Sequence, residues 1–328
     1  MSFDLHKYYK LKVDKQVYID GGKLGLKNNS SNCYINSIIQ CLVNTYPLID
    51  YIFSNNINNH DNKSRAYTSF ITVVYKLFHE KFNQDTSGLI RVLGKDNGVQ
   101  YDSCETLFEL LECIHYSIKY KVEFNIQGTE IVKSDKLMIK GFESWINHFK
   151  DGYSFIIENF YGNFITEHTK CKCSESFEPF SLLMLPPFET LEKSIEEYTK
   201  SEPCHCNSKR GTKKVSFWNL PDTLIINFKR YTSTGEKINS KVDFPFELDL
   251  KKFVSPLKCD NNKYMYSLYA VNYHIGTMQS GHYWSCCKDI TDTWYKYDDD
   301  NVERINDRTH VIRDSAYILF YQRTRILV

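Results

Sequence analysis

The chain has 328 residues, enough for one large domain or two ordinary ones, and its 41 Lys and Arg nearly balance its 40 Asp and Glu. The formal net charge of +1 gives no support for a nucleic-acid partner, and a charged fraction of 25% does not suit a wholly disordered chain. No segment approaches the roughly 18 consecutive apolar residues of a membrane span, and the N-terminal residues lack the apolar stretch of a secretion signal.

The eleven cysteines are the most informative part of the composition. A chain of this length does not need a disulfide framework, and without a secretion signal its thiols are expected in a reducing compartment. Such cysteines are buried, catalytic or metal-bound. We therefore expect an intracellular protein, cytoplasmic or nuclear and not secreted, that is a monomer with no membrane or nucleic-acid partner.

The first half of the chain is predicted to be helical. Residues 1–20 are polar and carry no capped periodic element, so they are predicted to be an extension, and the Asn-rich residues 53–64 are predicted to be a loop. Apolar side chains recur at helical spacing in three segments, which we predict to be helices: 33–44, 66–83 and 102–121. The NNSSN run before Cys33 supplies N-cap residues for the first helix, and Asp102 or Ser103 caps the third.

From about residue 153 the pattern changes to alternation with β-branched and aromatic runs, which predicts strands. The predicted strands are 154–158, 160–166, 177–182, 213–218, 223–230, 265–273, 281–288, 293–297 and 316–322, and a short helix is predicted at 189–200. Helices first and largely antiparallel strands second indicate an α+β fold.

Cys33 is a candidate nucleophile because it lies in the first turn of a predicted helix. The unpaired N–H groups and the positive end of the helix dipole stabilise a thiolate, which is the reactive form of cysteine. The alternative is a buried structural cysteine, which is the role that we expect for Cys41 on the apolar side of the same helix.

His282 is a candidate partner for a thiol. Two β-like runs flank the turn at residues 289–292, and a hairpin centred near Ile290–Thr291 places His282 opposite Asp299, or Asp298 after a one-residue slip. An imidazole oriented by an aspartate is the arrangement that activates a thiol nucleophile. The alternative is a surface histidine near a solvated run of aspartates.

Several segments together resemble one family. GLKNNSSNCYINSIIQCL at 25–42 resembles the cysteine box of the ubiquitin-specific proteases, and SGHYWS with WYKYDDDNV and AYILFYQR, within 280–323, resembles their histidine box. Residues 100–115, 217–231 and 241–250 resemble further boxes of that family. The boxes occur in the family's order, and the resemblance spans about residues 24–323.

The resemblance implies a papain-like cysteine protease fold of the α+β class, with a helical thumb and an antiparallel β palm and fingers. The implied boundaries are an N-terminal extension at 1–23 and a catalytic domain at 24–328, with the thumb at about 24–150, the fingers at about 155–230 and the palm at about 231–328. The implied activity is that of a deubiquitinase, which hydrolyses the (iso)peptide bond at the C-terminal glycine of ubiquitin through an acyl thioester.

The family's catalytic roles carry over to matching positions. Cys33 would be the nucleophile and His282 the general base and then acid. Asp298 would orient the imidazole, with Asp299 as a second candidate, and Asn28 would donate to the oxyanion together with the backbone N–H of Cys33. No cofactor is expected for catalysis.

Substrate contacts are implied in the same way. Asp102 matches an acidic residue that grips the Arg-rich tail of ubiquitin, and it can also act as an N-cap. Gln279, Gly281 and Tyr283 are expected to contact the substrate, and residues 276–279 resemble a flexible loop that folds over the tail. The implied partners are ubiquitin and ubiquitinated proteins.

The turn before the nucleophile departs from the family pattern, in which Gly-Asn-Thr precedes the cysteine. Ser30, Ser31 and Asn32 stand there instead. A serine with positive φ would be costly, whereas an asparagine tolerates that conformation, so we expect Asn32 to occupy any left-handed position. This departure motivates one alternative, a catalytically impaired scaffold that binds ubiquitin. A further alternative is a protease for another ubiquitin-like modifier.

A second group of cysteines suits a structural zinc site. Two close pairs, Cys171 with Cys173 and Cys204 with Cys206, offer four thiolates, although each pair is one residue shorter than the family's C-x-x-C. The alternatives are a metal-free set of reduced thiols, or His168 and His205 as substitute ligands or solvated side chains. The other thiols are expected in the core or at a strand edge: Cys104, Cys113, Cys259, Cys286 and Cys287.

Overall fold

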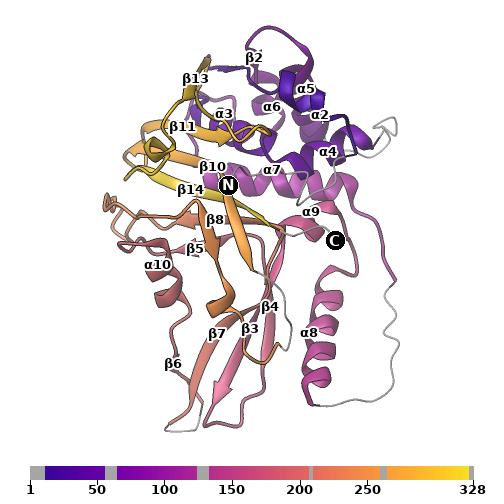
Figure 1. The fold of residues 1–328 in the computed structure, drawn as a ribbon, viewed down its shortest axis with the longest axis vertical. Coiled ribbons are helices and arrows are strands. Elements are labelled where there is room, and N and C mark those ends of the chain that lie inside the picture. The colour runs from indigo at the N-terminus through magenta and orange to yellow at the C-terminus, as the bar shows by residue number, and fades with distance from the viewer. Residues whose placement is uncertain (1–11, 56–64, 124–132, 207–209, 259–263, 325–328) are drawn as a thin grey trace.

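A computed structural model describes residues 12–55, 65–123, 133–206, 210–258 and 264–324. The molecule is elongated: the helices within residues 15–118 gather at one end, a large sheet follows, and long strands with the helix Lys133–Phe149 extend to the other end (Figure 1). Among the described residues, no helix has the length and apolar character needed to cross a bilayer. Cys259 lies outside the described residues.

Among the residues that the structure describes, the helical end contains the three predicted helices and three more. These are α2 (Lys15–Asp20), α3 (Cys33–Val43), α4 (Tyr46–Ser54), α5 (Arg65–His79), α6 (Ser87–Val92) and α7 (Ser103–Ile118). Every residue of α3 is buried, because this helix is enclosed by α4, α7 and the sheet. A short parallel pair, β1 (Leu26–Lys27) with β2 (Gln84–Asp85), joins the segment before α3 to the segment after α5.

The N-terminal prediction was wrong for the residues that form α2. Asp14 caps this helix by accepting from the backbone N–H of Gln16. Tyr18 is buried and its hydroxyl donates to Asp50 of α4 (3.1 Å). The helix has fewer than two turns, too short for a periodic pattern, and it depends on a buried carboxylate distant in sequence.

The large sheet runs in the order β13-β12-β11-β10-β14-β8-β5, and β9 pairs with the far part of β10. Its strands are β5 (Leu183–Leu185), β8 (Thr223–Phe228), β9 (Glu247–Asp249), β10 (Met265–Gly276), β11 (Gly281–Lys288), β12 (Trp294–Asp298), β13 (Asn301–Ile305) and β14 (Ala316–Arg323). All its pairings are antiparallel except that of β5 with β8. Because β5 and β8 fall within the range predicted as fingers, that range also supplies strands to the central sheet.

The two faces of this sheet belong to two hydrophobic clusters. Alternate residues along a strand divide between them: Ile318 packs toward the helices, whereas Leu319 packs toward the opposite side. The first cluster joins the sheet to α3, α5 and α7, and the second includes Leu191 and Ile195 of α10 (Leu191–Tyr198). This two-residue period fixes which strand residues face α3, α5 and α7.

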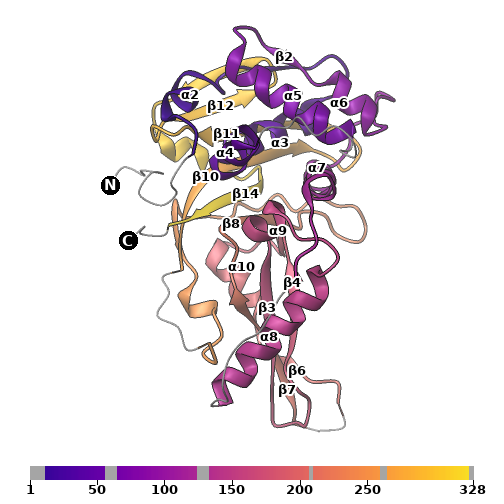
Figure 2. The same cartoon turned by 90° about the vertical axis from the view of Figure 1, so that its right-hand side faces the viewer.

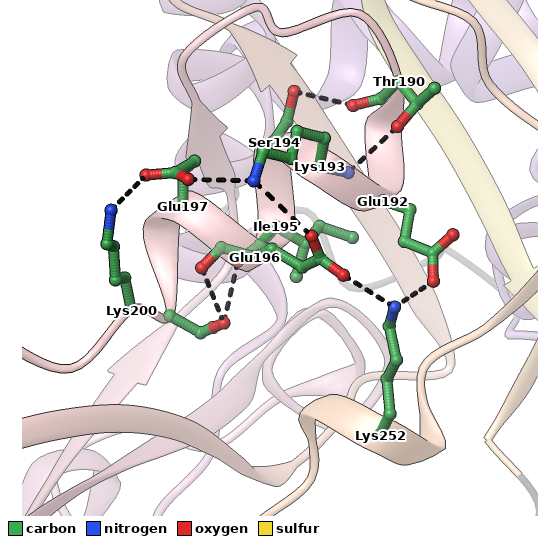
Figure 3. Close-up of polar contacts among 10 residues, drawn as sticks. Thr190, Glu192, Lys193, Ser194, Ile195, Glu196, Glu197, Lys200 and Lys252 are labelled. Atoms are coloured by element: carbon green, nitrogen blue, oxygen red, sulfur yellow. Dashed lines mark hydrogen bonds and ion pairs between the residues drawn. The ribbon is translucent and has the colours of Figure 1, made fainter.

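The helix predicted at 189–200 is confirmed as α10, and its ends are held by polar contacts (Figure 3). Thr190 caps the helix by accepting from the backbone N–H of Lys193 (3.1 Å). Lys252, from the short 3-10 helix η1 (Lys251–Phe253), forms ion pairs with Glu192 and Glu196 one turn apart. These contacts join α10 to the segment that precedes β10.

The far end is a narrower antiparallel sheet in the order β4-β3-β7-β6 (Figure 2). Its strands are β3 (Gly162–Thr169), β4 (Ser176–Phe180), β6 (Glu202–Pro203) and β7 (Thr212–Asn219). Helix α8 (Lys133–Phe149), which the sequence did not predict, packs on β4, and Gly141 lets it approach Phe177 and Trp218.

The prediction of a strand at 154–158 was also wrong. This segment lies at the start of α9 (Phe155–Phe160), where the hydroxyl of Ser154 accepts from the backbone N–H groups of Ile156 and Ile157. A good N-cap thus overrides the β propensity of the two isoleucines.

Candidate active site

The turn before α3 positions Cys33 as the first residue of a buried helix. Cys33 is itself only 3% exposed. The left-handed residue in this turn is Ser31, with φ of 55°, and not Asn32, whose φ is −83°. The expectation for Asn32 was therefore wrong, and the serine bears the less favourable conformation. Asn28 accepts from the backbone N–H of Asn32 (2.8 Å), which ties this turn together.

The hairpin brings His282 to Asp298. His282 Nε2 lies 2.6 Å from Asp298 Oδ1, at the start of β11 and the end of β12. The observed register pairs Ser285 with Tyr297, one residue away from the predicted register, and the ladder ends there. The imidazole therefore reaches Asp298 diagonally across the open end of the hairpin. Of the two candidate aspartates, Asp298 is the one that contacts the imidazole through Nε2.

The protonation of His282 reflects its two partners. A side-chain hydrogen bond with Cys33 is the largest influence, followed by burial, which opposes it, and by Asp298; together they raise the pKa of His282 from 6.5 to about 9. Because Nε2 faces Asp298, Nδ1 is the ring nitrogen left for the thiol. Burial alone would raise the pKa of Asp298, but hydrogen bonds from Lys296 (2.7 Å) and His282 outweigh burial and lower it. The arrangement favours an imidazolium between an anionic carboxylate and the sulfur.

Asp299 has a different set of partners. It adopts a left-handed conformation, with φ of 52°, at the turn into β13. Its carboxylate accepts from the side-chain amides of Asn28 (2.8 Å) and Asn36 (2.9 Å), and its backbone oxygen accepts from the N–H of Leu26. Asp299 thus joins the end of the hairpin to the segment before Cys33 and holds the amide of Asn28 in place.

Gln100 belongs to the site although sequence reasoning did not single it out. Its Nε2 donates to Cys33 Sγ (3.0 Å) and to the carbonyl of Gly281 (2.8 Å), and its Oε1 accepts from the N–H of Gly281 (2.7 Å). One amide therefore contacts both the thiol of Cys33 and the strand that carries His282. The only signal in the sequence was its position at the head of the box at 100–115.

Asp102 is confirmed as the N-cap of α7. Its Oδ1 accepts from the backbone N–H groups of Cys104 and Glu105, and its Oδ2 accepts from the hydroxyl of Tyr317 (2.7 Å). The carboxylate is therefore fixed in orientation by the helix and by β14.

The three predicted substrate contacts lie in and beside the β10–β11 turn. Gln279 is exposed and Gly281 is half-buried. Tyr283 is buried, and its ring stacks on His274 with centroids 4.2 Å apart. Gly281 cannot be replaced by a larger residue without movement, because an added Cβ would clash with the Nε2 of His274.

A second cluster lies at the tip of the narrow sheet. The donor atoms of His168, Cys171, Cys173 and Cys204 all lie within 4.8 Å of one another, so this group could hold a metal ion such as zinc. Cys206 is adjacent to the cluster, where it hydrogen-bonds with Cys173 and Cys204. The remaining described thiols are buried or half-buried as expected: Cys41, Cys104, Cys113, Cys286 and Cys287.

Comparison with known proteins identifies the family. A family model described as ubiquitin carboxyl-terminal hydrolase matches residues 24–321. The chain belongs to the ubiquitin carboxyl-terminal hydrolase family. It is 28% identical over 343 residues to ubiquitin carboxyl-terminal hydrolase 2 of Bos taurus and 27% identical over 362 residues to ubiquitin carboxyl-terminal hydrolase 4 of Vanderwaltozyma polyspora. These matches cover 92% of this chain but 55% and 41% of those proteins, so the chain spans about half the length of the curated relatives it matches.

Solved structures of the family share the fold. The SAGA Ubp8/Sgf11/Sus1/Sgf73 DUB module bound to ubiquitin aldehyde contains a chain that matches with a TM-score of 0.75 and 21% identity, over 94% of this chain and 71% of that one. A second structure, of the SAGA Ubp8/Sgf11/Sus1/Sgf73 DUB module, contains a chain that matches with a TM-score of 0.72 and 22% identity, over 94% of this chain and 70% of that one. The predicted papain-like α+β architecture of the ubiquitin-specific proteases is confirmed.

Proposed function

We propose that this chain is a cysteine deubiquitinase that hydrolyses the bond after the C-terminal glycine of ubiquitin. The observation that carries the proposal is the arrangement of Cys33, His282 and Asp298. The imidazole of His282 is hydrogen-bonded to the thiol of Cys33, and its Nε2 lies 2.6 Å from Oδ1 of Asp298. An oriented imidazole beside a thiol at a helix N-terminus is suited to acyl transfer.

The reaction follows from these positions. The Cys33 thiolate attacks the terminal carbonyl of ubiquitin, and the oxyanion accepts from the backbone N–H of Cys33 and from Asn28. The amide nitrogen of Asn28 has two hydrogens, so one can serve the oxyanion while the other stays on Asp299. His282 protonates the leaving amine, the thioester forms, and His282 then activates the water that releases ubiquitin.

Ubiquitin and ubiquitinated proteins are the proposed partners, bound by a thumb at about 24–150, fingers at about 155–230 and a palm at about 231–328. A cavity of about 750 Å³ between α7 and the narrow sheet supports this placement. Its lining includes Glu105, Glu109, Glu112 and Glu178, which suit a partner with basic groups. Asp102 would hold the Arg-rich tail, with Gln279, Gly281 and Tyr283 around it.

We also propose a structural zinc at the tip of the narrow sheet, where His168, Cys171, Cys173 and Cys204 gather; we call this place the finger tip. The sulfur atoms of Cys173 and Cys204 lie 3.8 Å apart. This is close to the sulfur separation of about 3.8 Å that follows from tetrahedral geometry with Zn–S bonds of about 2.3 Å. Zinc there would cross-link the ends of β3 and β6 without any part in the chemistry at Cys33.

Covalent labelling with a ubiquitin probe that carries a C-terminal electrophile tests the activity. We expect labelling of the wild type and of Cys113→Ala, a control that removes a half-buried thiol, and none of Cys33→Ala. Labelling that persists in Cys33→Ala would refute Cys33 as the nucleophile.

The two alternative functions give different outcomes in the same assay. A wild-type protein that binds ubiquitin but is neither labelled nor able to turn over a fluorogenic ubiquitin substrate is a binding scaffold. Faster cleavage of another ubiquitin-like modifier, measured side by side with ubiquitin, would change the assigned substrate.

A further inference from the structure

The finger tip offers five donor side chains for a tetrahedral ion that needs four. The four cysteines alone form two C-x-C pairs, which are shorter than a C-x-x-C knuckle. His168 changes this count, because it precedes Cys171 by the two-residue gap that a knuckle requires. Residues 168–173, which form the first arm of the site, can thus be described as an H-x-x-C motif (His168 and Cys171) followed by Cys173.

The backbone supports this arrangement. His168 and Thr169 are the last residues of β3, paired with Lys213 and Thr212 of β7. Lys170 then adopts a left-handed conformation with φ of 57°, which turns the chain sharply after the strand. This turn brings Cys171 back to the side of His168, so that both donors face the same point.

The distances match a mixed nitrogen and sulfur shell. Tetrahedral zinc with Zn–N of about 2.0 Å and Zn–S of about 2.3 Å separates a nitrogen from a sulfur by about 3.5 Å. His168 Nδ1 lies 3.5 Å from Cys204 Sγ, and Cys204 Sγ lies 3.8 Å from Cys173 Sγ. With Cys171, these are the four donors whose atoms all lie within 4.8 Å of one another.

The second arm, residues 204–206, is held close to the first by backbone contacts as well as by side chains. The N–H of Cys204 donates to the carbonyl of Gly211 (2.8 Å). Gly211 leaves room for the cysteines, since an added Cβ would lie 2.9 Å from the Cβ of Cys171 and 3.3 Å from the Sγ of Cys206. Cys206 hydrogen-bonds with Cys173 and Cys204 from outside the group of four.

We propose that zinc is held by His168 Nδ1, Cys171, Cys173 and Cys204, and that Cys206 is an outer thiol that hydrogen-bonds to the coordinated sulfurs. This inference rests on the zinc site proposed above and changes its ligand set. Outer hydrogen bonds of this kind orient ligands and tune the metal, but they do not replace a ligand.

The test measures the metal and not the activity. Full-length protein is purified as the wild type and as His168→Ala, Cys206→Ser and His168→Cys. His205→Ala is the matched control, because this histidine lies between Cys204 and Cys206 in the sequence. Zinc content is measured by elemental analysis, zinc affinity by competition with a chelating dye, and thiolate number by the sulfur-to-metal absorption of the Co²⁺-substituted protein.

We expect stoichiometric zinc in the wild type and unchanged binding in His205→Ala. His168→Ala should weaken zinc binding by at least ~100-fold, whereas Cys206→Ser should weaken it by no more than the ~10–100-fold loss of an outer contact. His168→Cys should keep zinc and gain sulfur-to-cobalt absorption, because it adds a thiolate. Cys206→Ser should keep the wild-type absorption.

Two results would overturn the inference, and they differ in meaning. Loss of zinc and of sulfur-to-cobalt absorption in Cys206→Ser, with both retained in His168→Ala, would restore the four-cysteine set and leave the zinc site intact. Wild-type protein without zinc that also fails to bind Co²⁺ would refute the zinc site itself. Far-UV circular dichroism of each variant shows whether the chain is still folded.

Discussion

The catalytic cleft and the finger tip both assemble side chains from distant parts of the chain, but different forces hold them. Cys33 begins a fully buried helix that packs on β11, and Asn272 in the middle of β10 hydrogen-bonds with Ser37 of α3 and Ser103 of α7. At the finger tip the cysteines are half-buried or exposed and lie at strand ends. Packing can therefore position the cleft, whereas the tip has little apolar contact, which is why we propose a metal cross-link there.

The largest effect should come from the triad. Asp298→Ala should lower kcat/KM for a ubiquitin substrate by ~10²–10⁴-fold, because His282 loses the carboxylate that orients its imidazole and stabilises the protonated form. Steady-state kinetics measure this change. Asp299→Ala, which leaves the contact between His282 and Asp298 intact, should cost less, and an equal loss in both variants would contradict the separate roles of the two aspartates.

Metal removal should affect the finger tip strongly and the catalytic cleft little. A chelator should lower the thermal midpoint and the turnover of ubiquitin, because the fingers lose their cross-link. Alkylation of Cys33 by a small thiol reagent, followed by peptide mass spectrometry, should continue at the untreated rate. Equal loss of both reactivities would show that the cleft depends on the metal after all.

Gln100 gives a smaller effect within the cleft. Gln100→Glu keeps the size of the side chain but replaces the donor to Cys33 Sγ with a carboxylate oxygen, so kcat/KM should fall by at least ~10-fold through the lost hydrogen bond and the added like charge. Rates that match the wild type in Gln100→Glu would exclude Gln100 from the positioning of the thiol.

The pH dependence should follow His282. Its pKa is raised from 6.5 to about 9, so the imidazolium persists at neutral pH and the alkaline limb of kcat/KM should lie near pH 9. Asp298→Asn should move that limb to lower pH. Since the folded pKa exceeds the unfolded one, the charged histidine stabilises the fold fully below about pH 6.5 and loses this contribution as the pH rises through 9.

The smallest effect concerns the turn before the nucleophile. Ser31→Asn should raise the free energy of unfolding by about 0.5 kcal/mol, because asparagine tolerates the left-handed conformation of Ser31 better than serine does. Urea denaturation measures the change, and Ser30→Asn is the matched control next to it. A decrease in stability for Ser31→Asn would indicate that the serine side chain itself is needed there.

Local signals in the sequence predicted much of this molecule. The periodicity of α3, α5 and α7 and the alternation of β10, β11 and β14 predicted those elements at nearly their observed bounds. The ordered boxes predicted the family and the pairing of Cys33 with His282. Helix α8 was missed although Met138, Phe142, Trp145 and Phe149 recur at helical spacing among polar residues, and α9 was mistaken for a strand because Ser154 supplies a cap that β propensity ignores.

The sequence by itself determined the class of fold and indicated Cys33 and His282 as the candidate nucleophile and imidazole, because these depend on short-range periodicity and on motifs that are contiguous in the chain. The tertiary structure decided which aspartate contacts His282, that Gln100 reaches Cys33, and that His168 joins the cysteines of the fingers. Each of these contacts depends on the register of a hairpin, the angle of a loop or a left-handed turn. A shift of one residue changes the partner without changing the hydrophobic pattern.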